Sequence, residues 1–140
     1  MKETPRSADL MTLLHAAGAA QEEVESKLAT MGLSLARLAA LKVLSDAGES
    51  LPLTQLAERL SCVKSNITQL VDRLEADGLV KRELDPRDRR ARLAAMTEAG
   101  RKACKEGSEA QQEAESALLS KLSTEESQQL AALLTKLERG

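Results

Sequence analysis

The sequence contains no phenylalanine, tyrosine or tryptophan in its 140 residues. This absence excludes an aromatic cage and a stacking platform for single-stranded nucleic acid, because both are built from aromatic side chains. β-Branched aliphatic residues are scarce too: 5 Val and 1 Ile stand against 25 Leu and 22 Ala. Because strands favour β-branched and aromatic residues whereas Leu and Ala favour helices, the composition nearly excludes an all-β fold and predicts a mainly α-helical one.

Long apolar segments are also missing. No run of residues approaches the roughly 20 apolar positions that a membrane-spanning helix needs. The first six residues lead into no apolar signal-peptide segment. We therefore expect a cytoplasmic protein with no membrane partner, whose length suits one domain over residues 1–140 and hardly two.

Side chains that carry chemistry are few, since the chain has one histidine, His15, and two cysteines, Cys62 and Cys104. A tetrahedral zinc site needs about four clustered ligands, which these scattered residues cannot supply. A catalytic triad would have to use His15, and no nucleophile elbow or glycine-rich turn accompanies it. The sequence therefore predicts no metal site, no cofactor and no enzymatic activity.

Charge is unevenly distributed along the chain. The formal net charge is −2, but residues 58–102 hold 11 Lys or Arg against 8 Asp or Glu. Within residues 81–92 there are six basic and three acidic side chains. A locally basic segment on an acidic chain indicates a small electrostatic contact site, although a solvated charged loop gives the same count.

Hydrophobic periodicity and breaker residues divide the chain into helices and short extended segments. Helices are expected over residues 7–31, 34–46, 55–60, 64–76 and 98–121. A last helix follows the capping box of Ser123 and Glu126. Extended segments are expected at residues 51–53, 79–84 and 91–96, the last two joined by a loop at 85–90. Two short helices joined by a turn and followed by a hairpin have the order of a winged helix-turn-helix.

The helix expected at residues 64–76 has an apolar face and a polar face. On a helical wheel its apolar side chains fall within about 100° of one another: Ile67, Leu70, Val71 and Leu74. The other side carries polar or charged residues: Ser65, Asn66, Thr68, Gln69, Asp72 and Arg73. Such side chains suit base and phosphate contacts in the DNA major groove, whereas the plain alternative is a solvent-exposed face. Because a basic hairpin follows, we favour DNA recognition.

Three motifs extend this pattern: DRLEADGLV at residues 72–80, DPRDRR at residues 85–90 and TEAG at residues 97–100. With them the chain resembles the MarR/SlyA family of bacterial transcriptional regulators. The resemblance implies a mainly α fold with a small β-hairpin wing. It divides the chain into a winged helix-turn-helix at residues 34–100 and a helical dimerisation region at residues 7–33 and 101–140. It also implies a homodimeric repressor on a pseudo-palindromic operator in double-stranded DNA.

The resemblance further implies roles for individual residues. The DNA-contacting positions are Ser65, Asn66, Thr68, Gln69, Arg73, Arg87, Arg89 and Arg90. Among them, Arg89 matches the wing arginine that enters the minor groove. Asp72 and Arg90 match a pair that ties the recognition helix to the wing.

Regulation in this family usually works through a small-molecule effector or through cysteine oxidation. For this chain a small-molecule effector stays open, with His15 as a candidate pocket residue in preference to a metal ligand. Cys62 and Cys104 are candidate redox residues, but a free cysteine also serves as a small buried hydrophobe, and a disulfide is unusual in the cytosol. The alternative functions are a winged-helix module for protein interaction and a regulator without an effector.

Overall fold

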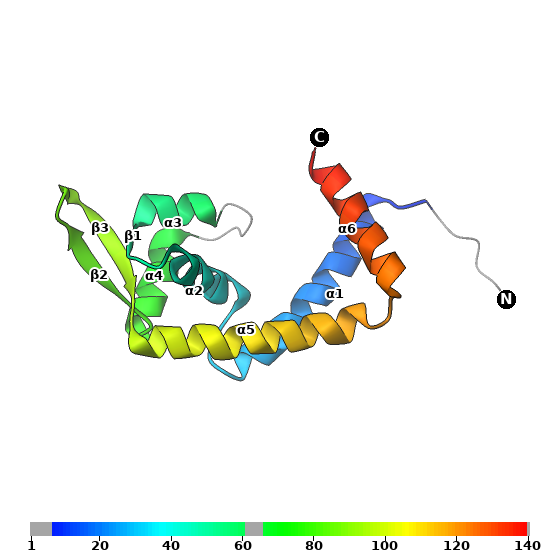
Figure 1. Ribbon diagram of the computed structural model, residues 1–140, viewed down its shortest axis with the longest axis horizontal. Helices are drawn as coiled ribbons and strands as arrows, with labels where there is room; N and C mark the ends of the chain where they lie inside the picture. Colours follow the sequence, from blue (N-terminus) through cyan, green and yellow to red (C-terminus); the bar gives the residue numbers. More distant parts are fainter. Residues whose placement is uncertain (1–6, 61–65, 140) are drawn as a thin grey trace.

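The computed structural model of the chain describes residues 7–60 and 66–139. Within them the chain forms six helices and three strands in the order expected for a winged helix-turn-helix (Figure 1). The helices are α1 (Leu10–Ala29), α2 (Leu35–Ala47), α3 (Leu53–Arg59), α4 (Ile67–Ala76), α5 (Glu98–Leu119) and α6 (Thr124–Glu138). The strands are β1 (Leu51–Pro52), β2 (Val80–Asp85) and β3 (Asp88–Met96). None of the described helices combines the length and the apolar character needed to cross a membrane.

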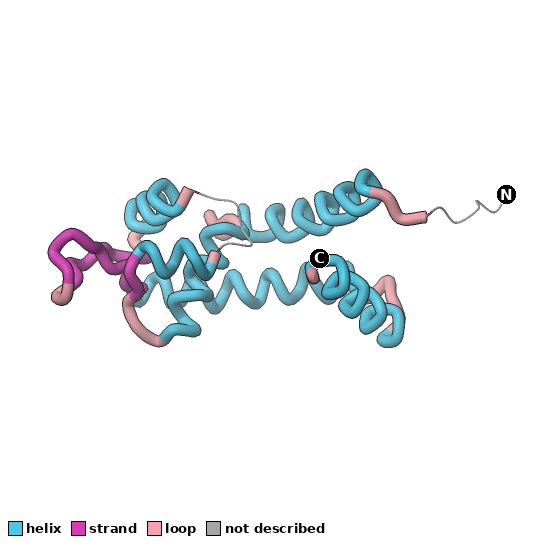
Figure 2. Tube along the Cα trace, turned by 90° about the horizontal axis from the view of Figure 1, so that it is seen from above, coloured by secondary structure: helices cyan, strands magenta, loops and turns pink. Residues whose placement is uncertain are grey.

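The long helix α5 connects two groups of elements (Figure 1). At its N-terminal end lie α2, α3, α4 and an antiparallel sheet with the strand order β1-β3-β2. At its other end lies α6, and α1 runs beside α5 and contacts it (Figure 2). The predicted mainly α fold with a β-hairpin wing is therefore confirmed.

A single cluster of buried aliphatic side chains holds the winged helix-turn-helix together. Its largest fully buried members come from α1, α2, α3, α4 and β2: Leu28, Leu38, Leu41, Leu56, Val71, Leu74 and Val80. By contrast, α6 has no buried residue, and α1 buries only Leu28 near its C-terminal end. The buried core therefore lies at one end of the molecule, whereas the leucines of α6 and of the N-terminal part of α1, at the other end, are exposed to solvent.

Local capping signals in the sequence locate three of the six described helix starts correctly, those of α2, α5 and α6. Helix α3 begins at Leu53, two residues earlier than expected, and no side chain caps it. The side chains of Ser34 and Thr97 accept backbone N–H bonds at the starts of α2 and α5. Ser123 and Glu126 form the predicted capping box of α6. Helix α1 begins three positions later than expected because Asp9 caps it, accepting the backbone N–H of Thr12 at 2.8 Å.

The root of the hairpin is tied to the start of α5 through backbone and hydroxyl contacts. The Thr97 hydroxyl donates to the Gly78 carbonyl at 2.6 Å and accepts the Gly100 N–H at 3.0 Å. The Thr97 N–H donates to the Leu79 carbonyl at 3.1 Å. Gly100 packs so closely on Leu79 that a Cβ there would lie 2.0 Å from its carbonyl oxygen. These four residues, called the hairpin joint below, fix the direction in which α5 leaves the sheet.

We predict that Gly100→Ala destabilises the protein, because a backbone carbonyl cannot move aside as a flexible side chain can. The expected loss is about 1–3 kcal/mol, the usual cost of overpacking a tight site. The matched control is Gly18→Ala, since Gly18 lies in α1 with no atom within 4 Å of an added Cβ. That change should stabilise the protein by about 0.5–1 kcal/mol. Urea unfolding of both variants measures the two effects, and equal midpoints would contradict the tight joint.

Candidate nucleic-acid interface

Helix α4 begins at Ile67, three residues later than the sequence predicted. The reason is its cap: the Asn66 side chain accepts the backbone N–H groups of Thr68 at 3.0 Å and Gln69 at 3.3 Å. The side-chain oxygen of Asn66 is therefore used in capping the helix, whereas its side-chain NH₂ group has two N–H donors that can bind a ligand. Ser65 and Cys62, two of the predicted site residues, lie outside the described residues.

The two faces of α4 are oriented as the helical wheel predicted. Leu70, Val71 and Leu74 are buried in the core, and Ile67 is half-buried. The predicted DNA-contacting residues of this helix that the structure describes are exposed, namely Asn66, Thr68, Gln69 and Arg73, and so is Asp72, the predicted wing-positioning residue. Because the apolar face anchors the helix, this polar face, called the outer face below, is presented to solvent as one surface.

The wing is a longer hairpin with a tighter turn than expected. The strands pair as far as Asp85 and Asp88, so the turn consists of Pro86 and Arg87 instead of the six residues that the sequence suggested. The side chains of Asp85 and Asp88 accept the backbone N–H groups of Arg87 at 2.9 Å and Arg90 at 3.0 Å. These two bonds satisfy backbone donors at the tip, where the register shifts and residues 89–91 have no partner in the paired register.

The wing presents three exposed arginines at and beside its tip. Arg87 lies in the turn, and Arg89 and Arg90 lie at the start of β3. Both lie where the register is irregular, between the Leu84–Arg92 and Asp85–Asp88 pairs. The structure brings these arginines together on one projecting element.

A single arginine from the wing contacts the outer face of α4. The Arg82 guanidinium donates to Asp72 at 2.6 Å and to Glu75 at 2.9 Å, and its backbone N–H donates to Glu75 at 3.1 Å. The hydrogen bond to the Asp72 carboxylate raises the pKa of Arg82. Each carboxylate is exposed, so these pairs add little to stability, but they orient the hairpin against the helix.

The predicted pairing of Asp72 with Arg90 is therefore wrong, since the partner of Asp72 is Arg82. Arg82 pairs with Ala94 near the base of the hairpin, next to α4, whereas Arg90 lies beyond the Leu84–Arg92 pair toward the tip. Residue parity is a partial signal for Arg82 in the sequence. It stands two positions after the buried Val80 and so points to the face that α4 covers.

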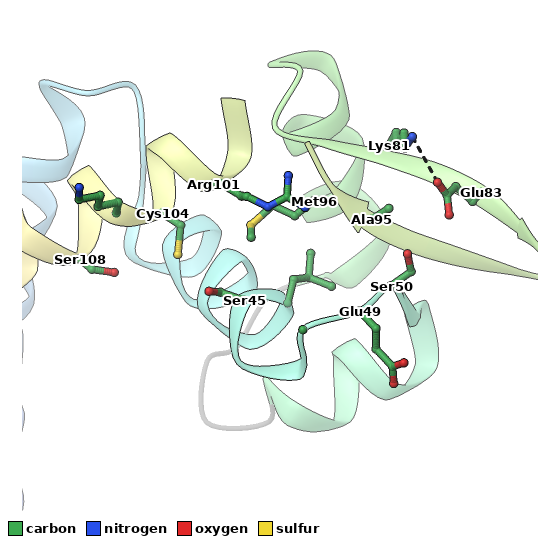
Figure 3. Close-up of a pocket in the computed structure, with 13 residues that line it drawn as sticks. Ser45, Glu49, Ser50, Lys81, Glu83, Ala95, Met96, Arg101, Cys104 and Ser108 are labelled. Atoms are coloured by element: carbon green, nitrogen blue, oxygen red, sulfur yellow. Dashed lines mark ion pairs between the residues drawn. The ribbon is translucent and has the colours of Figure 1, made fainter. Parts of the chain in front are cut away.

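On the opposite face of the hairpin lies a hollow of about 610 Å³ (Figure 3). It is bounded by the C-terminal end of α2, the base of the wing and the first turns of α5. Its polar rim includes Lys81, Glu83, Arg101 and Lys105, with Lys81 paired to Glu83 at 3.3 Å. Its apolar wall includes Leu44, Ala95, Met96 and Cys104. Its volume is in the range of small-molecule sites, and its lining is more polar than most such sites have.

Cys104 is buried against this hollow, only 8% exposed. Burial raises the pKa of its thiol, although a hydrogen bond with Ser108 acts in the opposite direction. A raised pKa leaves the thiol protonated at neutral pH, and the protonated form is a poor nucleophile. These properties favour the packing role of Cys104 over the redox role.

Comparisons with known proteins agree on one group. The sequence profile described as the MarR family matches residues 31–91. A probable transcriptional regulator from Pseudomonas aeruginosa, a solved structure, is 31% identical with a TM-score of 0.74, covering 88% of this chain and 94% of that one. The structure of CouR from Rhodococcus jostii RHA1 bound to p-coumaroyl-CoA is 28% identical with a TM-score of 0.75, covering 92% and 91%.

Curated relatives match over a shorter region. The transcriptional activatory protein BadR of Rhodopseudomonas palustris is 36% identical over 91 residues, which are 64% of this chain and 49% of BadR. The matches cover less than half of the length of each curated relative, 44% to 49%. The chain belongs to the MarR family. The resemblance drawn from its motifs is thereby confirmed.

His15 stays a predicted pocket residue in this MarR-family chain. It lies exposed on α1 and is not among the residues that line the hollow of Figure 3. Within the described ranges, no three His, Cys, Asp or Glu side chains are grouped as metal ligands.

We predict that Cys104 reacts slowly with a thiol reagent in the folded protein. The test uses Cys62→Ser, so that Cys104 is the one remaining thiol. Reaction with dithiobisnitrobenzoate at pH 7.5 should be much slower than for a free thiol, because burial and a raised pKa both reduce thiolate attack. Denaturant should restore the full rate. A native rate equal to that of a free thiol would mean that Cys104 is accessible and ionised.

Proposed function

We propose that this chain is a sequence-specific regulator that binds double-stranded DNA as a homodimer. The observation that carries the proposal is the contact of Arg82 with α4, which holds the wing beside that helix. Both elements carry side chains that can bind DNA. The outer face of α4 offers amide and hydroxyl groups to a major groove, and the wing arginines extend beside it toward the neighbouring minor groove. Arg suits the narrow, electronegative minor groove of A·T-rich DNA. The names of the curated relatives, which include a transcriptional activatory protein, support the same function.

Dimerisation is supported by the apolar residues that the fold leaves exposed. Helix α1 exposes Leu10, Met11, Leu13 and Leu14, and α6 exposes Leu130, Leu133, Leu134 and Leu137. Half-buried leucines continue this surface at the end of α5 and in the turn that follows it: Leu118, Leu119 and Leu122. Burying such residues against a second copy gains about 25 cal/mol for each Å². A two-fold dimer also supplies a second recognition helix about one DNA turn away, roughly 34 Å, as a palindromic operator requires.

Regulation is the finer part of the proposal. The dimer represses transcription by occupying its operator. A small molecule releases the dimer from the operator by shifting the population toward a second dimer arrangement, in which the spacing of the two α4 helices no longer matches that of the DNA grooves. The hollow beside the wing supports a small-molecule effector, because an occupant there touches α2, the hairpin and α5 at once. CouR was solved with a small-molecule ligand. Oxidation of Cys104 is the weaker trigger, since its thiol is buried and has a raised pKa.

DNA binding is tested by selecting duplexes from a random pool with the purified protein. We expect enrichment of a pseudo-palindromic sequence, called the selected duplex below. Failure to enrich any sequence would contradict the proposal and favour a winged-helix module for protein interaction.

Arg89→Ala should weaken binding to the selected duplex by about 1–3 kcal/mol, because it removes the proposed minor-groove contact. Lys102→Ala is the matched control: it removes one exposed positive charge from α5, away from the wing tip and outside the lining of the hollow. Fluorescence anisotropy at one fixed salt concentration measures both variants. Equal affinities for Arg89→Ala and Lys102→Ala would remove Arg89 from the interface.

Leu133→Asp should convert the dimer to a destabilised monomer, because it places a charge in the proposed apolar interface. Leu84→Asp is the control: Leu84 on the wing is 66% exposed and Leu133 on α6 is 60% exposed. Sedimentation and thermal melting at several protein concentrations should show dissociation for Leu133→Asp alone. A stable wild-type monomer at micromolar concentration would contradict the dimer and the spacing mechanism together.

A further inference from the structure

Helix α4 is held at two places by arginines that come from different elements. Arg82 of the wing contacts its outer face at Asp72 and Glu75. Arg37 of α2 reaches its C-terminal end, where its Nη1 donates to the Asp77 carboxylate at 3.1 Å. Asp77 is the C-cap residue of α4, so this second contact acts on the end of the recognition helix that lies away from its reading residues.

Arg37 is also bound to the turn between α1 and α2. Its Nη1 donates to the Gly32 carbonyl at 2.8 Å, and its Nε donates to the Ser34 hydroxyl at 3.2 Å. The side chain is only 15% exposed, less than that of any other residue in a salt bridge of the described chain. Because the guanidinium is a rigid plane with fixed donor directions, it cannot serve all three partners if they move independently.

The turn that Arg37 contacts is itself fixed to α1. The N–H groups of Met31 and Leu33 both donate to the Leu28 carbonyl, and Gly32 takes a positive φ of 72° that closes the turn. The Glu25 carboxylate of α1 accepts the backbone N–H of Leu35, which opens α2. A shift of the C-terminal end of α1 therefore moves the acceptors that hold Arg37.

We propose that Arg37 is a positioning residue for the recognition helix, which couples the setting of α4 to the C-terminal end of α1. Without the contact of Arg37 to Asp77, Arg82 is the remaining side chain of the described residues that ion-pairs with α4 from another element, so the orientation of α4 on the core is less restricted. Asp77 also accepts from Nε of Arg73 at 3.4 Å, so the same carboxylate steadies a predicted DNA-contacting side chain. The inference rests on the proposed DNA-binding function, and it adds the route by which a change at α1, where the dimer is proposed, reaches α4.

The test measures affinity for the selected duplex and for a scrambled duplex of equal length. Arg37→Met keeps the aliphatic stem and removes every donor. Lys102→Met is the control, because it removes one positive charge from an exposed position on α5 that does not line the hollow. We expect Arg37→Met to lose about tenfold or more in affinity for the selected duplex, the loss that one charge-assisted contact commonly causes. Binding to the scrambled duplex should fall no further than in Lys102→Met, because phosphate attraction depends on charge and not on helix setting. Equal losses on both duplexes would overturn the proposal.

Asp77→Ala provides the second measurement, and its hydrogen exchange decides the matter if Arg37→Met fails to fold. The double variant should bind the selected duplex no worse than Asp77→Ala alone, since both changes remove one contact. Asp77→Ala should also speed amide hydrogen exchange in the α1–α2 turn, across the contact from the substituted residue. Additive losses, or faster exchange confined to α4, would overturn the coupling. Because wild-type protein must first yield the selected duplex, failure of the DNA-binding proposal is seen separately, before any variant is made.

Discussion

The close approach of Gly100 to the Leu79 carbonyl is the constraint on which the arrangement of the protein depends. It brings the first turn of α5 against Leu79, which lies just after the C-terminal end of α4. Thr97 hydrogen-bonds to both sides of this contact, to the Gly78 carbonyl and to the Gly100 N–H. Helix α4, the root of the hairpin and the long helix α5 therefore meet at one joint. Any side chain larger than hydrogen at position 100 would force these elements apart, because its Cβ would meet a backbone atom.

From this joint the structure extends in two directions with different physical character. On one side, buried aliphatic residues fix the helix-turn-helix, and polar and basic groups remain on its outer face and wing. On the other side, α1 and α6 expose leucines that the single chain cannot cover. The same chain thus presents a charged surface suited to phosphate and an apolar surface suited to a second copy.

The side-chain contacts that orient α4 from outside the core are few and ionic. Arg82 and Arg37 approach α4 from the wing and from α2, and each binds carboxylates that lie at the molecular surface. Partly exposed ion pairs contribute little to folding stability, but a bidentate or shared arginine restricts orientation strongly. Orientation is what sequence recognition needs, because a recognition helix must enter the groove at a set angle. The interface can therefore be adjusted without unfolding the core beneath it.

The sequence alone determined the features that depend on neighbours along the chain. These local patterns are the helix caps at Ser34, Thr97 and Ser123, the apolar and outer faces of α4, and the family motifs. Helical periodicity and capping chemistry are enough to recognise them in the sequence. Only the tertiary structure decided which arginine meets Asp72, how far the hairpin pairs, and that Cys104 is buried. Arg82 and Arg90 are equally basic in the sequence. Strand pairing beside α4 brings Arg82 within hydrogen-bond distance of the Asp72 carboxylate and places Arg90 toward the tip of the wing. Such distances depend on packing between segments that are remote along the chain, so local patterns in the sequence do not determine them.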